Sequence, residues 1–202
     1  MRVSVFIGMM IIAILLIIGL FFFKTNEDNY TYTNGVNSFA IMKVDNSDYK
    51  IKIYVSRPGL DSEPFFIHTR YDPKKLEEIP VEGNFEGLLK KPHIFITLDP
   101  NLGLTSMTTI AGLEIKKFLD NKYLFAIPVN GAFTEIYGEK EDYPIRTCKD
   151  VNEKQGIILL SLGKETKVFM ENNGCVVIQG KTEEEIVKAA DRLAFYLLGI
   201  MN

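Results

Sequence analysis

The sequence predicts an α/β protein in which an N-terminal transmembrane helix precedes one mixed-sheet α/β domain with a β-rich N-terminal part. Three observations support this prediction. Residues 3–23 form an apolar run without a charge. Residues 50–56 alternate between polar and apolar side chains, as a half-buried strand does. After residue 92 a strand, a helix and another strand follow one another, and such a unit joins parallel strands through a right-handed crossover.

The charge of the chain is unevenly distributed. The 202 residues carry a formal net charge of −3, and 47% of them are hydrophobic. Arg2 is the only charged residue among residues 1–23, so the rest holds 22 basic and 26 acidic residues, a net charge of −4. The lack of a basic excess excludes a bulk nucleic-acid binder. The abundance of Ile, Leu, Val and Phe excludes a disordered chain.

The apolar run over residues 3–23 (VSVFIGMMIIAILLIIGLFFF) is predicted to span a membrane. Its length matches the ~20 residues that cross a bilayer core, and it lacks the polar face of a helix that packs on a protein core. Phe21, Phe22 and Phe23 stand where small residues would mark the cleavage site of a signal peptide. We therefore expect an uncleaved single-pass anchor over residues 1–24, with a cleaved signal peptide as the alternative.

Residues 25–37 are polar and are interpreted as a stalk that leads to a domain over residues 38–202. The basic residues on the two sides of the apolar run nearly balance, so they hardly decide its orientation. The sequon Asn29-Tyr30-Thr31 predicts glycosylation of Asn29, and the chain has only two cysteines. Both features favour a single-pass protein of the cell membrane whose large domain lies outside the cytoplasm.

The first half of the large domain is predicted to be rich in strands. Residues 45–48 (DNSD) form a turn cluster between two apolar stretches, which indicates a β-hairpin. A further strand is expected around Phe65–Ile67. The segment DPKKLEEI follows, and it predicts a short helical turn with Asp72 as its cap and Pro73 at its first position.

The second half is predicted to alternate strands and helices. Residues 93–98 (HIFITL) are continuously apolar, which is typical of a strand covered on both faces. Residues 105–119 have an apolar stripe at helical spacing, and the apolar run 123–129 is the next expected strand. Three more strands are expected at 156–162, 166–171 and 175–179. The capping box that starts at Thr182 begins a final amphipathic helix.

The two cysteines are predicted to form a disulfide if the domain lies in an oxidising compartment. Cys148 and Cys175 lie 27 residues apart in the sequence. Closing that loop is worth roughly 3 kcal/mol when the loss of chain entropy in the unfolded state is counted. The alternative is a pair of buried, reduced cysteines in a cytosolic protein.

The loop over residues 99–106 (DPNLGLTS) is the most site-like feature of the sequence. It follows a predicted strand and starts a helix, and ligands of open α/β sheets bind beyond the carboxyl ends of strands. Asp99, Asn101, Thr105 and Ser106 are therefore the candidate ligand-binding residues, with the free amides of the helix start as an anion site. The alternative is structural, because Asp and Asn shape turns and Thr or Ser caps helices.

Other patterns that carry chemistry are weak or missing. The segment between the strands predicted at 123–129 and 156–162 contains acidic residues that could form a catalytic carboxylate pair. Charge runs of this kind are usually solvated, however. The acidic residues are Glu135, Glu139, Glu141, Asp142 and Asp150. His68 and His93 have no ligand spacing for a metal, and the phosphate-binding, dinucleotide and nucleophile-elbow motifs do not occur. We therefore assign no catalytic residue, metal or cofactor.

Four segments together carry a resemblance. They are the N-terminal apolar run, HIFITLDPNLGLTSMTTIAGLEI, the TCKD around Cys148, and GCVVIQGKTEEEIVKAADRLAFYLLGIM. In this combination the chain resembles uncharacterised single-pass membrane proteins of archaea. The last segment alone also resembles parts of archaeal surface-layer proteins, although this domain is too small to build a lattice by itself. The resemblance implies an extracytoplasmic domain at the cell envelope and brings no catalytic residue.

The sequence therefore favours a membrane-anchored extracytoplasmic domain with a binding or assembly role at the cell envelope. The membrane would be contacted through residues 3–23, and an envelope protein or a membrane complex would be the partner. Two alternatives remain open. One is an envelope hydrolase with its site at the 99–106 loop, and the other is an accessory subunit of a membrane complex, in which Gly8 and Gly19 allow close helix packing.

Overall fold

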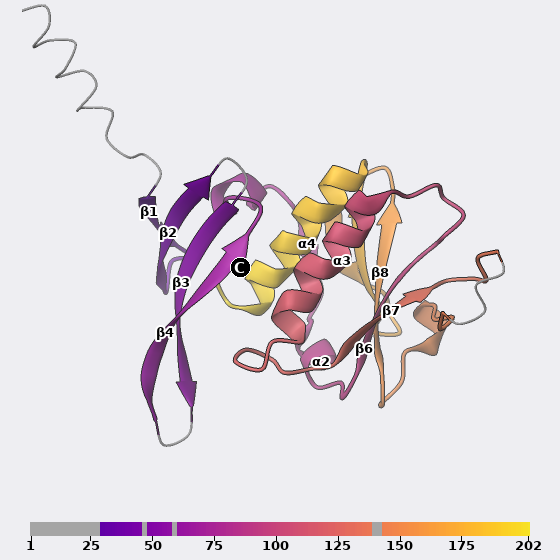
Figure 1. Ribbon diagram of the computed structural model, residues 1–202, viewed down its shortest axis with the longest axis horizontal. Coiled ribbons are helices and arrows are strands. Elements are labelled where there is room, and N and C mark those ends of the chain that lie inside the picture. Colours follow the sequence, from indigo (N-terminus) through magenta and orange to yellow (C-terminus); the bar gives the residue numbers. More distant parts are fainter. Residues whose placement is uncertain (1–28, 46–47, 58–59, 139–142) are drawn as a thin grey trace, which may run out of the picture.

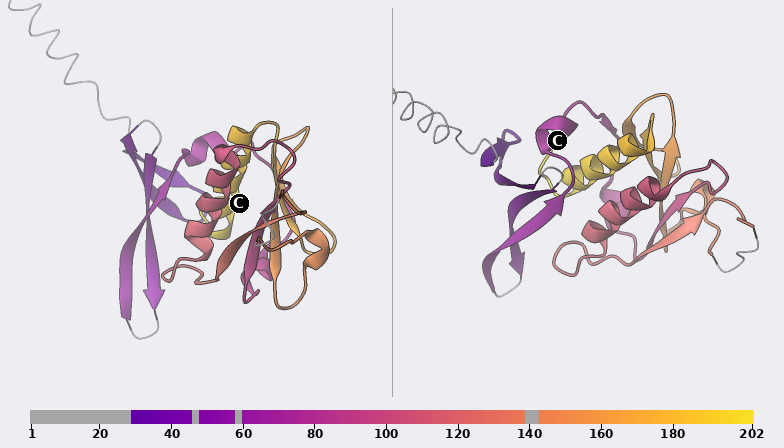
Figure 2. Two further views of the ribbon diagram at one scale, coloured as in Figure 1. Left: turned by 45° about the vertical axis from the view of Figure 1, so that its right-hand side comes forward. Right: turned by 45° about the horizontal axis from the view of Figure 1, so that its top comes forward.

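The computed structural model describes residues 29–45, 48–57, 60–138 and 143–202, which form three layers. A four-stranded sheet lies on one side, a six-stranded sheet lies on the other, and two helices fill the space between them (Figures 1 and 2). One continuous cluster of buried hydrophobic side chains runs through all three layers.

The four-stranded sheet is antiparallel and follows the chain in the order β1-β2-β3-β4. Its strands are β1 (Asn29–Thr33), β2 (Ser38–Asp45), β3 (Asp48–Arg57) and β4 (Leu60–Thr69). Ile41 pairs with Ile51, and Ile51 pairs with Ile67, so three buried isoleucines cross the inner face in one row. The alternation of polar and apolar residues that predicted a half-buried strand over residues 50–56 arises because the other face of the sheet points away from the core.

Strand β1 lies within residues 25–37, which the sequence analysis interpreted as a polar stalk. Part of this segment forms a strand and not an irregular stalk, because Tyr30 and Tyr32 alternate with polar residues and their side chains pack toward the core. Tyr32 is buried, and it pairs across the sheet with Phe39. Two tyrosines are enough apolar surface for an edge strand, although the segment contains almost no aliphatic residue.

The six-stranded sheet is mixed and has the order β5-β9-β10-β8-β6-β7. Its strands are β5 (Val81–Glu82), β6 (Ile94–Leu98), β7 (Val129–Phe133), β8 (Gly156–Leu162), β9 (Lys167–Met170) and β10 (Val176–Gly180). All neighbouring pairs are parallel except β9 with β10. The predicted strand–helix–strand unit is therefore confirmed as β6, α3 and β7.

The position of β7 corrects the strand expected over residues 123–129. Residues 121–126 form turns instead, in which the amides of Leu124 and Ala126 both donate to the carbonyl of Asn121 at 3.0 Å. The apolar side chains of this segment still pack on the core, and Ile127 is buried. An apolar run therefore indicates burial here, but not a strand.

Helices α3 (Ser106–Leu119) and α4 (Glu183–Leu197) form the middle layer, and shorter helices lie in the connections. These are η1 (Pro73–Leu76), α2 (Glu86–Leu89) and η2 (Cys148–Asp150). The side chain of Thr182 accepts a hydrogen bond from the amide of Glu185 at 3.2 Å, which confirms the predicted start of α4. Every residue of α4 from Ala189 to Phe195 is buried, because a sheet lies on each side of the helix.

The predicted fold class is corrected in two respects. First, no helix within the described residues is long and apolar enough to cross a membrane. Helices α3 and α4 have 14 and 15 residues, whereas a bilayer core requires ~20; the anchor predicted over residues 1–24 lies outside the described part. Second, the strands form two separate sheets and not one, because strand patterns do not say which sheet a strand joins.

Candidate functional site

The 99–106 loop follows β6 as predicted, but its polar side chains bond within the chain. The carboxylate of Asp99 accepts a hydrogen bond from the amide of Asn101 at 2.8 Å, which is an Asx turn. The side-chain amide of Asn101 donates to the carboxylate of Glu135 at 2.5 Å. Both residues therefore shape the loop and tie it to the segment after β7.

The anion position at the start of α3 is occupied by a carboxylate of the same chain. One oxygen of Glu183 accepts hydrogen bonds from the amides of Thr105 (2.8 Å) and Thr108 (3.0 Å). It also accepts from the hydroxyls of Thr105 (3.1 Å) and Thr108 (2.6 Å). Burial raises the pKa of Glu183, but these four hydrogen bonds outweigh it and hold that pKa below its usual range.

Thr105 also caps α3 by accepting a hydrogen bond from the amide of Met107, and Ser106 is exposed at the first position of the helix. The structural alternative for this loop is thus the one that the geometry supports. Sequence reasoning missed Glu183, which lies 78 residues after Thr105. Glu183 lies among acidic residues in the first turn of α4, and this position indicated only a favourable interaction with the dipole of its own helix.

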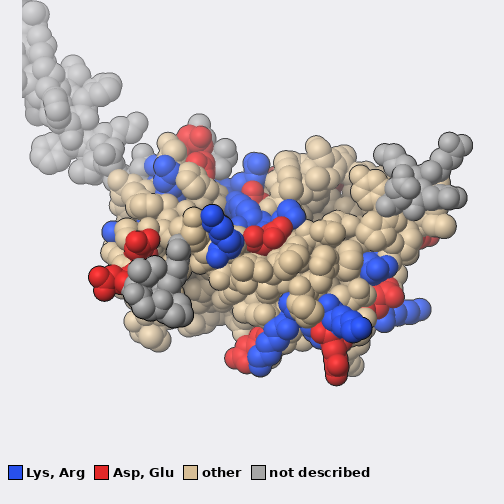
Figure 3. Space-filling view, turned by 60° about the horizontal axis from the view of Figure 1, so that its bottom comes forward, with Lys and Arg blue, Asp and Glu red and all other residues tan. Residues whose placement is uncertain are grey.

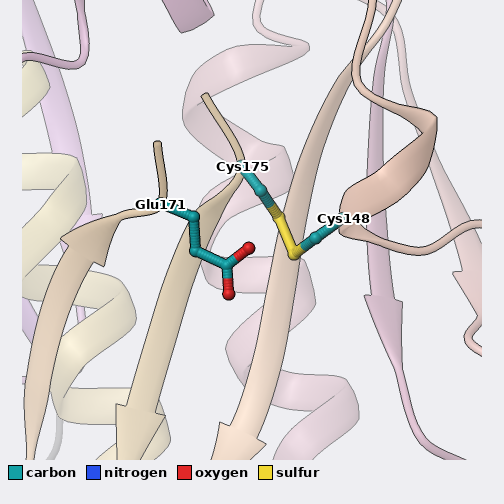
Figure 4. A group of neighbouring side chains, drawn as sticks. All are labelled: Cys148, Glu171 and Cys175. Carbon is teal, nitrogen blue, oxygen red and sulfur yellow. A yellow bond between two sulfur atoms is a disulfide. The ribbon is translucent and has the colours of Figure 1, made fainter. Parts of the chain in front are cut away.

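The predicted disulfide is confirmed. Cys148 and Cys175 are joined, with their Cα atoms 5.2 Å apart. Figure 4 shows the bridge between η2 and the start of β10. The side-chain amide of Asn173 donates to the carbonyl of Cys148 at 2.6 Å and holds the same two segments together.

Glu171 lies beside the disulfide, and its carboxylate points toward the two sulfur atoms (Figure 4). The carboxylate and both sulfurs lie within 4.8 Å of one another, which is a spacing that a metal ion could bridge. The sulfurs are bonded to each other, however, and only thiolates are good metal ligands. In the disulfide form the group therefore offers a single carboxylate.

The other predicted residues lie apart from one another. Asn29 is exposed at the start of the edge strand β1, so its side chain is accessible to modification. Asp150 accepts hydrogen bonds from the amide and the hydroxyl of Thr147 at 2.7 and 2.9 Å, as a capping box of η2. Glu139, Glu141 and Asp142 lie outside the described residues.

An apolar groove of about 280 Å³ lies between α3 and β7. Gly112 of α3 and Gly131 of β7 lie in its walls, and Ile96, Leu98 and Leu160 of the sheet line it. An added Cβ at Gly131 would meet no atom within 4 Å. Two residues without side chains thus leave space that larger residues would fill.

The segment after β7 passes from this face of the sheet, where Tyr143 lines the groove, to the opposite face at Arg146. Ile96 faces α3, so its neighbour Thr97 points to the opposite face. The hydroxyl of Thr97 donates to the carbonyl of Arg146 at 2.7 Å, which places the following segment on that opposite face. Strand β7 lies at the edge of the sheet, so no further strand of the described sheet extends the floor of the groove beyond it.

Aromatic and aliphatic side chains surround the open side of this groove. The ring of Phe133 lies 6.0 Å from that of Tyr137 and 5.0 Å from that of Tyr143. Leu113 is 56% exposed and Ile136 is 66% exposed. Exposed apolar side chains that gather around a concave surface are typical of a binding site.

The free edge of β7 is closed at both of its ends. The ammonium of Lys116 donates to the carbonyl of Val129 at 2.5 Å and pairs with Asp120 at 2.8 Å. At the other end, the amide of Phe133 donates to the carbonyl of Pro144 at 3.0 Å, and the amide of Arg146 donates to the carbonyl of Phe133 at 2.8 Å. A further strand therefore has little backbone left to pair with.

A buried carboxyl pair joins the two helices to the end of β4. One oxygen of Asp191, on α4, accepts hydrogen bonds from the amides of Arg70 and Tyr71, both at 3.1 Å. Its other oxygen has no donor among the described residues and faces Glu114 of α3. Glu114 in turn pairs with Arg70 at 3.1 Å and with Lys117.

Burial and the neighbouring carboxylate favour the protonated form of Asp191. Asp191 is fully buried, and Glu114 is 7% exposed. Burial, and then the charge of Glu114, raise the pKa of Asp191 to about 8. Neither residue lines the apolar groove described above, and we assign the pair a structural role. The charged side chains elsewhere gather in small groups of mixed sign, as on the face shown in Figure 3.

The chain was compared with protein-family models, with curated proteins and with solved structures, and none of these comparisons gives a match.

Proposed function

We propose that the chain is an extracytoplasmic binding domain of the cell envelope, and that its ligand occupies the groove between α3 and β7. The observation that carries the proposal is the groove itself, which is concave, mostly apolar and lined in part by the neighbouring rings of Phe133 and Tyr143. The disulfide between Cys148 and Cys175 supports an oxidising compartment, since such bridges persist outside the cytoplasm. The exposed sequon at Asn29 agrees with the same location.

The groove favours a compact apolar ligand over an added strand. Its volume of about 280 Å³ is close to the lower end of small-molecule pockets, which start at roughly 300 Å³. Lys116 and the segment from Pro144 to Arg146 already use the backbone at both ends of β7. An aromatic or branched aliphatic group, from a small molecule or from a side chain of a partner, matches these dimensions and this lining.

Filling the groove tests this proposal. The change Gly131→Leu adds a side chain to a residue that lines the groove and at which an added Cβ meets no atom within 4 Å. Gly87→Leu is the matched control, because Gly87 also has no atom within 4 Å of an added Cβ and lies on α2. The probes are a set of small aromatic and branched aliphatic compounds, observed by ligand NMR with the full chain in non-ionic detergent.

The expected result is saturable binding of a subset of these probes by the wild type and by Gly87→Leu. Binding to Gly131→Leu should be at least about tenfold weaker, because the apolar contact area of the probe is lost. Equal binding to both glycine variants would contradict the proposed groove, and so would the absence of any saturable probe. Circular dichroism of both variants confirms that the fold is intact.

A further inference from the structure

A second hollow, of about 570 Å³, lies where three segments distant in the sequence meet. These are the connection from η1 to β5, the turn between β8 and β9, and the start of α4. Five lysines and four glutamates line the hollow. The lysines are Lys75, Lys164, Lys167, Lys181 and Lys188.

Three of the four carboxylates in this lysine hollow are already engaged. Lys167 pairs with Glu165 at 3.2 Å and with Glu82 at 3.9 Å. The carboxylate of Glu185 accepts hydrogen bonds from the hydroxyl of Thr166 at 2.5 Å and from the amide of Lys181 at 3.0 Å. Only Glu78 has no partner among the described residues.

The lysines are less well neutralised than the glutamates. Lys188 pairs with Glu184 at 2.9 Å, outside the hollow. Lys75, Lys164 and Lys181 form no ion pair within the described chain, and each comes from a different segment. The hydroxyl of Thr166, the amide of Lys181 and the nearby ammonium groups of Lys181 and Lys188 lower the pKa of Glu185. The five ammonium groups and four carboxylates leave the lining with one positive charge in excess, and three of the lysines have no carboxylate of the described residues within ion-pair distance.

We propose that this hollow binds a phosphate-bearing anion, whose oxygens accept hydrogen bonds from Lys75, Lys164 and Lys181. Three ammonium groups on three sides suit an anion with several charged oxygens better than a single carboxylate. The start of α4 contributes little, because the side chain of Thr182 already caps it. The hollow is much larger than one phosphate, and it leaves room for the rest of a phosphoester. This site is separate from the apolar groove.

The test measures anion binding by the full chain in non-ionic detergent at low ionic strength. Two probes separate the sources of the phosphate: inorganic pyrophosphate represents the free anion, and glycerol phosphate represents a lipid headgroup or an envelope polymer. Binding is followed by isothermal titration calorimetry. The double variant Lys164→Ala/Lys181→Ala removes two of the three donors, and Lys90→Ala/Lys154→Ala is the matched control, because both of its lysines are exposed elsewhere.

We expect saturable binding of at least one probe, about tenfold weaker in Lys164→Ala/Lys181→Ala and unchanged in the control. Raising the salt concentration should weaken binding, because the donors are exposed to solvent. Glu78→Gln should strengthen binding, since it removes the one unpaired carboxylate. Preference for one probe identifies the source. If neither probe binds, or if both double variants bind equally, the hollow is not an anion site.

Discussion

The change Asp191→Asn should alter how the stability of the protein depends on pH. In the folded state Asp191 is buried against Glu114, and its pKa is raised from 3.8 to about 8. The unfolded chain releases this proton near pH 4, whereas the folded chain keeps it until pH about 8. Between these values the folded state binds one more proton than the unfolded state, so the free energy of unfolding falls as the pH rises.

The size of this effect follows from the pKa difference. Each pKa unit corresponds to about 1.4 kcal/mol, so a shift of about four units sets an upper limit near 6 kcal/mol. The actual loss between pH 4 and 8 should be a few kcal/mol, because Arg70 and Lys117 partly compensate the second negative charge. This stabilisation is fully present below pH about 4 and is lost as the pH passes about 8.

Asparagine reproduces the protonated form of Asp191. Its side-chain oxygen can still accept from the amides of Arg70 and Tyr71, while its NH₂ group can donate to Glu114. The free energy of unfolding should be measured by urea titration between pH 4 and 9, followed by circular dichroism. The stability of Asp191→Asn relative to the wild type should rise with pH across this range. Parallel curves for the two proteins would refute the raised pKa of Asp191.

Two other substitutions test single contacts through their effect on the free energy of unfolding. Replacing Cys148 and Cys175 together by Ser should lower the free energy of unfolding by about 3.5 kcal/mol, since the bridge closes a loop of 27 residues; a loss below about 1 kcal/mol in urea titrations would contradict this estimate. Glu183→Gln should cost about 1–2 kcal/mol at neutral pH, because it weakens four hydrogen bonds to the start of α3. Since the pKa of Glu183 is lowered on folding, the difference from the wild type should shrink as the pH falls below about 4.5, and a constant difference would be the contrary result.

Local patterns predicted those parts of the fold that local forces decide. The cap at Thr182, the antiparallel pairing of β2 with β3 and the crossover from β6 to β7 each depend on residues near in the sequence, and these elements are present as expected. The disulfide was predicted because two cysteines have only one pairing. Residues 121–126 form turns although their apolar pattern predicted a strand, because an apolar run that packs on a core need not be a strand.

The tertiary features could not be predicted in the same way. The division into two sheets depends on the burial of α4 on the sides that face both sheets. The buried residues include the charged Asp191 and Arg192, which interrupt the apolar pattern in the sequence. The candidate anion site at Thr105 looked free because its occupant, Glu183, is distant in the sequence. The groove depends on the path of the chain after β7, and two glycines, Gly112 and Gly131, are too weak a signal to indicate it.

The central position of α4 has a consequence for biogenesis. The four-stranded sheet is synthesised first, yet its inner face is covered by a helix that begins at Glu183. The contacts that seal this arrangement are very long in sequence: Asn34 bonds to the carbonyl of Gly199, 165 residues away, and Asn202 bonds back to the carbonyl of Asn34. Such non-local contacts make folding slow. The inner face of the N-terminal strands therefore stays exposed until α4 has been synthesised and packs on it. An exported chain would complete its fold only after it has crossed the membrane.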